Sequence, residues 1–430
     1  MNSSTPALRK MADGTVKQRN MLTGTEVWTV PGRGNRPLSV PTKDPKPITS
    51  SGDHCAFCEK RYLETPPEKA RLVRQGDGWK ILRNVKADQL FATTAEFRRI
   101  PNLFEIMSAN YWAANYNAHP SSAQHQLMAE YLVTGYDHIM QIMRTKLAAS
   151  GLSETEIAGL AEDELLSGAL GFFYGGHDVI VARRHFIEGA TTDDQLASSG
   201  TLSPQEHDAY MRMTVDALEN LYEINQHVKY VAAFQNWLKP AGASFDHLHK
   251  QLVAIDEVPI QISTEIDKLR RDEKIYDDIL QVAASRDLVL AQNEHAVAVA
   301  DFGHRFPTVA VWALGAAKAP WEAPLSVRRS VSDILHAMHA ATGAEVPCNE
   351  EWYHRPRNSP APVRWRILLK WRISTLAGFE GGTRIYLNTI DPWGVRDRMI
   401  PRLQKLREDG KIANMRIGSE CKVDPHLLQG

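Results

Sequence analysis

A comparable order of predicted elements occurs twice along this chain of 430 residues, and it constrains the fold more than any other feature. In the first half, apolar runs and helical periodicity predict a buried strand, a long helix and two more strands, at residues 179–182, 203–228, 230–234 and 247–255. In the second half the same signals predict two strands, a helix and a strand, at residues 297–302, 308–312, 326–341 and 363–373. No strong sequence repeat accompanies this order. We therefore predict an α+β protein of two similar lobes.

Length and composition exclude several classes of protein. A chain of this length buries one or two domains of ordinary size. Apolar residues make up 43% and charged residues 23%, and the net charge of -1 argues against nucleic-acid binding. The opening residues lack the apolar core of a signal peptide, and no later run is long and apolar enough to span a membrane. We expect a cytoplasmic protein with no nucleic-acid or membrane partner.

Two helical patterns lie between the opening strands and the first lobe's central elements. Apolar residues recur at helical spacing over residues 121–150 and predict a long amphipathic helix. A second pattern, over residues 153–170, opens with Ser153 and Glu156 at the spacing of a capping box. Together they indicate a helical insertion at about residues 105–175.

An alternation of polar side chains marks the strand predicted at residues 247–255. Side chains along a strand alternate between its faces, so His247, His249 and Gln251 are expected on one face. The alternative is a set of exposed polar residues on an edge strand. A preceding Gly242-Ala-Ser244 loop and the apolar residues that follow favour a buried strand of the core instead.

Four cysteines are too few for a disulfide framework, and two of them, Cys55 and Cys58, form a CxxC. Their thiolates are suited to a soft divalent metal if two further ligands come from elsewhere. The alternatives are a redox pair or two unrelated thiols. Imidazoles in polar or loop contexts are the candidate partners, namely His54, His119, His177, His185 and His247.

Arg33 and Arg36 lie three residues apart in a turn rich in glycine and proline, with Asn102 a candidate companion. Guanidinium groups match the geometry of phosphate, although such arginines are also common on surfaces.

Taken together, the segments resemble the galactose-1-phosphate uridylyltransferase-like family of the HIT superfamily. The resemblance follows the chain in order through Asn20–Trp28 and Pro31–Pro37, Cys55–Cys58 and Thr65–Glu68, Ile100–Phe104, His177–Val181 with Arg184 and His185, and the spacing of Asn236, Gly242, Ser244, His247, His249 and Gln251. It implies tandem HIT-like lobes with antiparallel sheets and flanking helices, an N-terminal catalytic lobe at residues 1–260 and a C-terminal lobe at 261–430.

The resemblance also implies the roles of individual residues. It implies a structural zinc ion, held by Cys55, Cys58, His185 and His247, and a nucleophile, His249, that carries the nucleotide. Gln251 and Ser244 are then the residues that contact the phosphates, and the substrate pocket takes Arg33, Arg36, Asn102, Asn236 and Glu380. The family is typically dimeric, which implies a homodimer.

The sequence departs from the family in the second lobe. Many members bind a second metal there, and Glu265 and His354 match two of its ligands. Leu368 and Lys370 replace the other two imidazoles, so we expect that site to be lost, with Lys370 pairing with Glu265 instead. In the first lobe Lys250 stands between His249 and Gln251, and strand alternation predicts that it faces away from them.

Near the C-terminus, Glu380 resembles a sugar-binding glutamate, whereas Ser374 and Thr375 replace a lysine and a phenylalanine common in relatives. The resemblance therefore implies a hexose-1-phosphate uridylyltransferase-like enzyme of galactose and nucleotide-sugar metabolism. Its partners would be a nucleoside diphosphate sugar and a sugar 1-phosphate. The alternatives are a phosphorylase of nucleoside diphosphate sugars or dinucleoside polyphosphates, and a non-catalytic nucleotide-binding protein stabilised by zinc.

Overall fold

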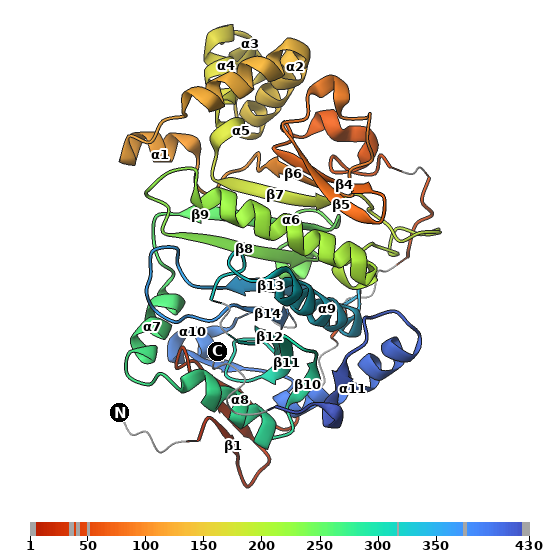
Figure 1. The fold of residues 1–430 in the computed structure, drawn as a ribbon, viewed down its shortest axis with the longest axis vertical. Helices are drawn as coiled ribbons and strands as arrows, with labels where there is room; N and C mark the ends of the chain where they lie inside the picture. The colour runs from red at the N-terminus through yellow and green to blue at the C-terminus, as the bar shows by residue number, and fades with distance from the viewer. Residues whose placement is uncertain are drawn as a thin grey trace.

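A computed structural model describes residues 6–33, 38–39, 44–49, 52–315, 318–372 and 376–423. Within these ranges, twelve strands form one large sheet and four short strands form a second (Figure 1). No helix in the described part of the chain is long and apolar enough to cross a membrane.

The large sheet is antiparallel at every pairing and runs through both lobes. Its first-lobe strands are β4 (Ala70–Gln75), β5 (Gly78–Arg83), β6 (Phe97–Pro101), β7 (His177–Ala182), β8 (Tyr230–Trp237) and β9 (His249–Ile255). Its second-lobe strands are β10 (Val289–Gln292), β11 (Ala296–Asp301), β12 (Thr308–Ala313), β13 (Cys348–Tyr353), β14 (Arg366–Trp371) and β16 (Arg416–Ile417). Strands β8 and β13 pair at the centre, and the order outward is β9, β7, β6, β4, β5 on one side and β14, β12, β11, β10, β16 on the other. The predicted α+β fold of tandem antiparallel lobes is confirmed.

Two helices cover one face of this sheet. Helix α6 (Pro204–Tyr222) lies against the first-lobe strands, helix α9 (Leu325–Thr342) against the second-lobe strands, and the two pack on each other (Figure 1). Ser203 fixes the start of α6, because its hydroxyl accepts from the backbone of Glu206 while Pro204 occupies the first turn. Helix α11 (Pro392–Glu408) extends this layer over β10 and β11. His249 and Gln251 lie on the opposite face of the sheet, beside the apolar side chains of Val179 and Val181.

The predicted insertion forms a helical cap at one end of the molecule, above β6 and β7 (Figure 1). Its helices are α1 (Ala109–Tyr116), α2 (Ser122–Ala149), α3 (Glu154–Ala158), α4 (Glu162–Ala169) and α5 (Gly171–Tyr174). The single helix predicted at 153–170 is in fact two. It ends at Gly159 and restarts after extended Ala161, where three acidic residues in the first turn of α4 stabilise a new N-terminus.

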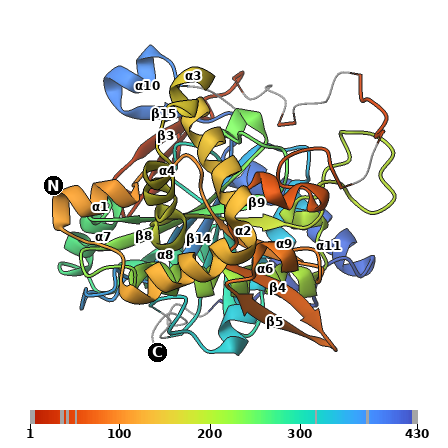
Figure 2. The ribbon, with the colours of Figure 1, turned by 90° about the horizontal axis from the view of Figure 1, so that it is seen from above.

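The N-terminal strands belong to the smaller sheet. Strands β1 (Leu8–Lys10), β2 (Val16–Arg19) and β3 (Glu26–Thr29) pair in order, and β3 also pairs in parallel with β15 (Ile385–Leu387). Figure 2 shows β3, β15 and α10 (Gly378–Thr383) together at one edge. The remaining elements are α7 (Ile260–Leu269), α8 (Ile275–Ser285) and five short 3-10 turns, η1 (Glu59–Glu64), η2 (Ala87–Gln89), η3 (Ser199–Thr201), η4 (Lys239–Ala241) and η5 (Gly418–Glu420).

Several predicted bounds shift. The helix expected at 203–228 ends at Tyr222, and the strand expected from His247 begins at His249. The strand expected at 363–373 is β14, bounded by Arg366 and Trp371. The shift at β9 matters for the site, because it leaves His247 in the loop before the strand.

Candidate functional site

Four side chains from three distant segments meet in one cluster. The ligand atoms of Cys55, Cys58, His185 and His247 all lie within 4.8 Å of one another. The two sulfurs are 3.8 Å apart, and the sulfur-to-Nδ1 distances range from 3.4 to 3.8 Å. A tetrahedral zinc ion with bonds of about 2.3 Å to sulfur and about 2.0 Å to nitrogen separates its ligands by about 3.8 and 3.5 Å. The cluster thus has the dimensions and donor set of a closed tetrahedral zinc site.

The surrounding structure orients these ligands. Cys58 immediately precedes η1, His185 follows β7, and His247 lies just before β9. The Nε2 of His247 is 2.6 Å from the carbonyl oxygen of Ala182, to which it donates. That bond leaves Nδ1 unprotonated for a metal, which is the usual arrangement for a histidine ligand. The ligand set expected from the resemblance is therefore assembled.

The other candidate imidazoles are not part of the cluster. The ring of His54 packs edge-on against His185 with centroids 4.7 Å apart. His119 is exposed and contacts the side chain of Asn117. His177 lies further along β7, among a different group of residues.

His249 is buried and follows the cluster ligand His247 by two residues. Its Nδ1 donates to the carbonyl oxygen of His247 across 2.7 Å, so the proton resides on Nδ1 and Nε2 keeps its lone pair. Burial lowers the pKa of His249 below its ordinary value, which favours the neutral ring at neutral pH. The ring of Phe57, between the two cysteines, packs 5.5 Å from that of His249. The result is a neutral imidazole with a free, oriented nitrogen.

Gln251 joins a small hydrogen-bonded group with Asn102 and His177. The Nδ1 of His177 accepts from the backbone of Ile106 at 3.1 Å, so its Nε2 carries the proton and donates to Oε1 of Gln251, 3.1 Å away. The amide nitrogen of Asn102 lies 3.4 Å from the same oxygen. With Oε1 engaged, the amide nitrogen of Gln251 is left as a donor. The sequence pointed to His177 as a candidate metal ligand, and nothing in it indicated this contact with Gln251.

The loop before β9 is held by asparagines from both lobes. Asn236 donates to the carbonyl oxygen of Gly242 at 3.5 Å and accepts from Asn349 at 2.7 Å. Asn349 also donates to Ala241 at 2.8 Å, which ties the loop to β13. Gly242 has a φ of +90°, a conformation that favours glycine, and the exposed Ser244 follows it. Asn349 is a supporting residue that no motif in the sequence pointed to.

Lys250 faces away from His249, as predicted, and is buried beneath α6 and α9. Its Nζ lies 2.6 Å from Oε1 of Glu350, whose other oxygen is 2.7 Å from Nε2 of His339. Although burial raises the pKa of Glu350, Lys250 and His339 outweigh that effect and lower it. The Lys250 ammonium also lies 4.5 Å from the ring centroid of Tyr210 on α6. Lys250 therefore anchors the back of the strand that carries His249.

The predicted pairing of Lys370 with Glu265 is wrong. Lys370 contacts Glu351, at 2.5 Å, and Glu265 is held by both guanidinium nitrogens of Arg366, at 2.7 and 2.5 Å. Arg366 prevails because its planar fork matches a carboxylate at two points. His354, the other residue matched to the family's second metal, lies 3.1 Å from the carbonyl oxygen of Val231 through Nε2.

The remaining substrate-binding candidates lie elsewhere. Arg33 and Glu380 both line a hollow of about 570 Å³ beside α10, together with Trp28 and Phe379. Glu380 is buried and accepts from the backbone of Ala377 at 2.9 Å. Arg36, Ser374 and Thr375 fall outside the described residues.

Comparison with known proteins gives relatives over most of the chain. ADP-glucose phosphorylase of Arabidopsis thaliana is 22% identical over 380 residues, which cover 86% of this chain and 88% of the relative. Galactose-1-phosphate uridylyltransferase of Thermotoga maritima is 26% identical over 224 residues, which cover 47% of this chain and 69% of the relative.

The fold is also similar to solved structures. The crystal structure of an ADP-glucose phosphorylase from Arabidopsis thaliana with bound ADP-glucose has a TM-score of 0.59 and 17% identity, covering 91% of this chain and 98% of that one. A GalT-like protein from Arabidopsis thaliana has a TM-score of 0.54 and 16% identity, covering 90% of this chain and 98% of that one.

The antiparallel sheet of two lobes, the Cys2His2 cluster and the adjoining histidine strand define a galactose-1-phosphate uridylyltransferase-like protein of the HIT superfamily, and this chain is a divergent member. The family model that matches it is described as a domain of unknown function, DUF4921. That match spans residues 11–429, and the chain belongs to this family.

Proposed function

We propose that this protein is a nucleotidyltransferase that carries a nucleoside monophosphate on Nε2 of His249. The observation that carries the proposal is the geometry of this ring. Its Nδ1 proton is held by the carbonyl oxygen of His247, and its Nε2 has a lone pair, in a buried position two residues before Gln251. A neutral imidazole fixed in one tautomer is an effective nucleophile toward phosphorus.

In the first half-reaction, Nε2 attacks the α-phosphorus of a nucleoside diphosphate sugar. A P–N bond forms, the bond from that phosphorus to the bridging oxygen breaks, and the sugar 1-phosphate leaves with the electron pair. In the second half-reaction, a phosphate oxygen of the acceptor attacks the same phosphorus and the P–N bond breaks, which restores His249. The Nδ1 proton stays on the ring throughout, bonded to the His247 carbonyl.

Other residues would stabilise the charge that develops on the α-phosphate. The amide nitrogen of Gln251 is oriented by His177 and would donate to a phosphate oxygen, a contribution of about 3 kcal/mol in comparable sites. We assign Ser244 to the leaving phosphate, and Asn236 to holding its loop. Asn102, Arg33, Arg36 and Glu380 are proposed for the nucleotide and sugar.

A zinc ion would act as a structural clamp. The four protein ligands fill a tetrahedral shell, so no position is left for substrate. Joined by the four ligands, the loop that carries Phe57 and the residues just before β9 would be held beside His249.

We propose two acceptors for the nucleotide in the second half-reaction. The motifs favour a sugar 1-phosphate, as in the uridylyltransferases. The relative that matches 86% of the chain is a phosphorylase, which favours inorganic phosphate as acceptor and an adenine nucleotide as donor. We also propose, from the resemblance alone, a homodimer whose lobes divide near residue 260.

The test is intact-mass spectrometry of the zinc-loaded protein after incubation with ADP-glucose or UDP-glucose. We expect a mass increment of one adenylyl or one uridylyl group in the wild type and in His119→Ala, an exposed-histidine control, and none in His249→Ala. Addition of inorganic phosphate or of a hexose 1-phosphate then identifies the acceptor by which of them removes the adduct. Absence of an adduct with every donor, in protein that contains zinc, would overturn the proposal.

A further inference from the structure

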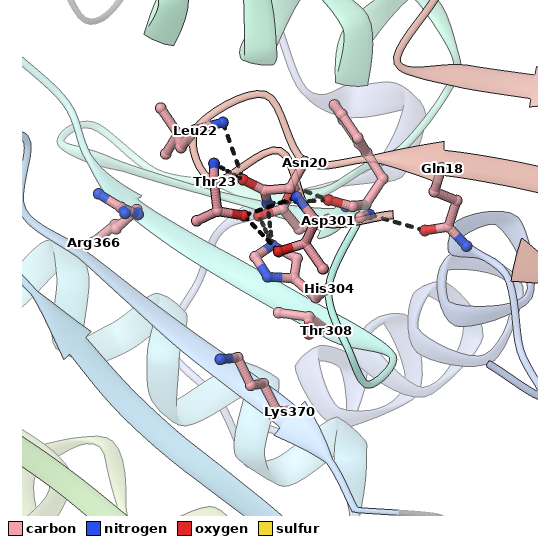
Figure 3. A network of polar contacts seen from close by, with 12 residues as sticks. Gln18, Asn20, Leu22, Thr23, Asp301, His304, Thr308, Arg366 and Lys370 are labelled. Atoms are coloured by element: carbon pink, nitrogen blue, oxygen red, sulfur yellow. Dashed lines mark hydrogen bonds and ion pairs between the residues drawn. The ribbon is translucent and has the colours of Figure 1, made fainter. Parts of the chain in front are cut away.

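A second polar cavity lies on the sheet face that carries Gln251, but in the second lobe. It has a volume of about 330 Å³ and lies over β12, β13 and β14, closed by the turn after β2 and by the segment between β11 and β12 (Figure 3). Figure 3 shows Arg366 and Lys370 on one side, facing Asn20, Thr23 and His304. The proposed reaction uses none of these residues.

The sheet register places this cavity with respect to the His249 group. Gln251 is opposite Phe234, Phe234 is opposite Glu351, and Glu351 is opposite Leu368. Directly opposed side chains share a face, so Glu351 points to the same side as Gln251, about 10 Å away across two strand spacings. The cavity therefore occupies, in the second lobe, the place that the His249 group occupies in the first.

Most charges that line the cavity are balanced by a neighbour. Lys370 pairs with Glu351 at 2.5 Å, and His304 contacts Asp301 at 2.8 Å. The guanidinium of Arg366 is neutralised by Glu265. These pairs give walls that are polar but close to neutral.

Two arginines line one end of the cavity. Arg305 and Arg372 both lie over the ring of Phe306, with guanidinium carbons 5.0 and 4.7 Å from its centroid. Arg372 donates to the side-chain oxygen of Asn349 at 2.5 Å, and its Nε is buried without a hydrogen-bond partner. Neither arginine has a carboxylate partner among the residues that the structure describes.

The chemistry of these two guanidinium groups suits an anion. Burial and the positive charge of Arg305 lower the pKa of Arg372, and the charge of Glu351 offsets part of this effect. An arginine with a buried N–H that has no partner, beside a second arginine at the same ring, can bind phosphate through charge-assisted hydrogen bonds. The remainder of the lining supplies hydroxyl, amide and carboxylate groups from Thr23, Asn20 and Glu351, which suit a polyhydroxylated body.

We propose that this cavity is a second binding site, for a small phosphorylated sugar, with the phosphate between Arg305 and Arg372 and the hydroxyl groups over β13 and β14. The site is separate from the nucleotidyl-transfer group and binds its ligand without consuming it. Its occupant contacts Asn349, which holds the loop before β9, so binding there communicates with the loop that carries Ser244.

Isothermal titration of the full-length, zinc-loaded protein with glucose 1-phosphate tests the proposal without any turnover. We expect two equivalents to bind to the wild type, and one of them to weaken by at least about tenfold in Arg305→Gln and in Arg372→Gln. Arg270→Gln removes an exposed arginine of the same lobe and should leave both equivalents unchanged. Arg305 is exposed, so its variant leaves the core intact.

Absence of binding to the wild type, or binding in which every equivalent survives both substitutions, would overturn the second site. Titration with inorganic phosphate decides the ligand class: binding weaker than that of glucose 1-phosphate supports the sugar contacts, and equal binding shows that the sugar part is wrong. The adduct experiment is run on the same variants. Normal adduct formation in Arg305→Gln separates this site from the first, and failure of the adduct in every protein would leave the titration result standing.

Discussion

The two lobes have the same arrangement of strands, but the side chains on the equivalent strands differ. In the first lobe, β9 carries His249 and Gln251, which are neutral hydrogen-bonding groups beside a metal cluster. In the second, β14 carries Leu368 and Lys370 on the equivalent strand, and the lining is made of ion pairs. The difference shows that this scaffold fixes where side chains point, while a few residues decide between covalent chemistry and binding.

Loss of a zinc ligand should have the largest effect. Cys58→Ala is expected to release zinc, to abolish adduct formation and to lower the free energy of unfolding by several kcal/mol, since structural zinc sites bind with about 10–16 kcal/mol. Metal content, intact mass and chemical denaturation measure these effects. Cys421→Ala, at a cysteine outside the cluster, should change none of them. Normal zinc content in Cys58→Ala would contradict the assigned ligand set.

Glu350 and Glu351 lie on opposite faces of β13, so substituting each of them tests the two faces separately. Glu350→Gln leaves Lys250 buried without a counter-charge, and we expect a loss of about 3–5 kcal/mol in the free energy of unfolding. Glu351→Gln breaks a pair whose glutamate is 32% exposed, and we expect about 1 kcal/mol or less. Denaturant titration of both variants measures the difference. Equal losses would show that the Lys250 pair is not the anchor we infer.

The orientation of Gln251 should matter more for chemistry than for stability. Gln251→Ala is expected to slow adduct formation by about 10²–10³, the usual effect of removing one oriented donor. His177→Ala should produce a smaller part of the same loss, because Gln251 is then present but no longer fixed. Rapid-quench kinetics measures both rates. If adduct formation is slow in Gln251→Ala but unchanged in His177→Ala, then His177 does not orient Gln251.

Acid is expected to destabilise the fold through two buried histidines. Burial lowers the pKa of His336 and of His354 to about 4, so between pH 6.5 and 4 the unfolded chain binds more protons than the folded one. Stability is therefore retained above pH 6.5 and lost as the pH falls, by about 1.4 kcal/mol per pH unit and per group. Unfolding measured from pH 7 to 4.5 tests this, and His354→Gln should flatten the slope. The exposed-histidine variant His119→Ala should not.

Much of the first lobe could be predicted, because its motifs are ordered and closely spaced. The CxxC cluster, the alternation of His249 and Gln251 on β9 and the capping box at Ser153 depend on local geometry, and the structure has each of them, whereas His247 lies in the loop before the strand. Choosing His185 and His247 among five imidazoles required the resemblance, since ligand spacing in the sequence carries no information about contacts between distant segments.

What the sequence could not show are competitions between neighbours in space. Lys370 was assigned to Glu265, but Arg366 lies four residues away on the same strand face and binds that carboxylate at two points. Asn349 was missed because its partner Asn236 is 113 residues away in the other lobe. Both cases depend on the β8–β13 pairing and on side-chain geometry, and no short stretch of the sequence indicates either of them.

The zinc cluster also sets an order of events during protein synthesis. His247 follows Cys55 by 192 residues, and the whole helical cap lies between them. At ordinary rates of elongation that interval lasts roughly 10 to 40 seconds. Throughout it the CxxC loop has left the ribosome without its full set of ligands, so its two thiols meet the redox and metal conditions of the cell before the site that protects them exists.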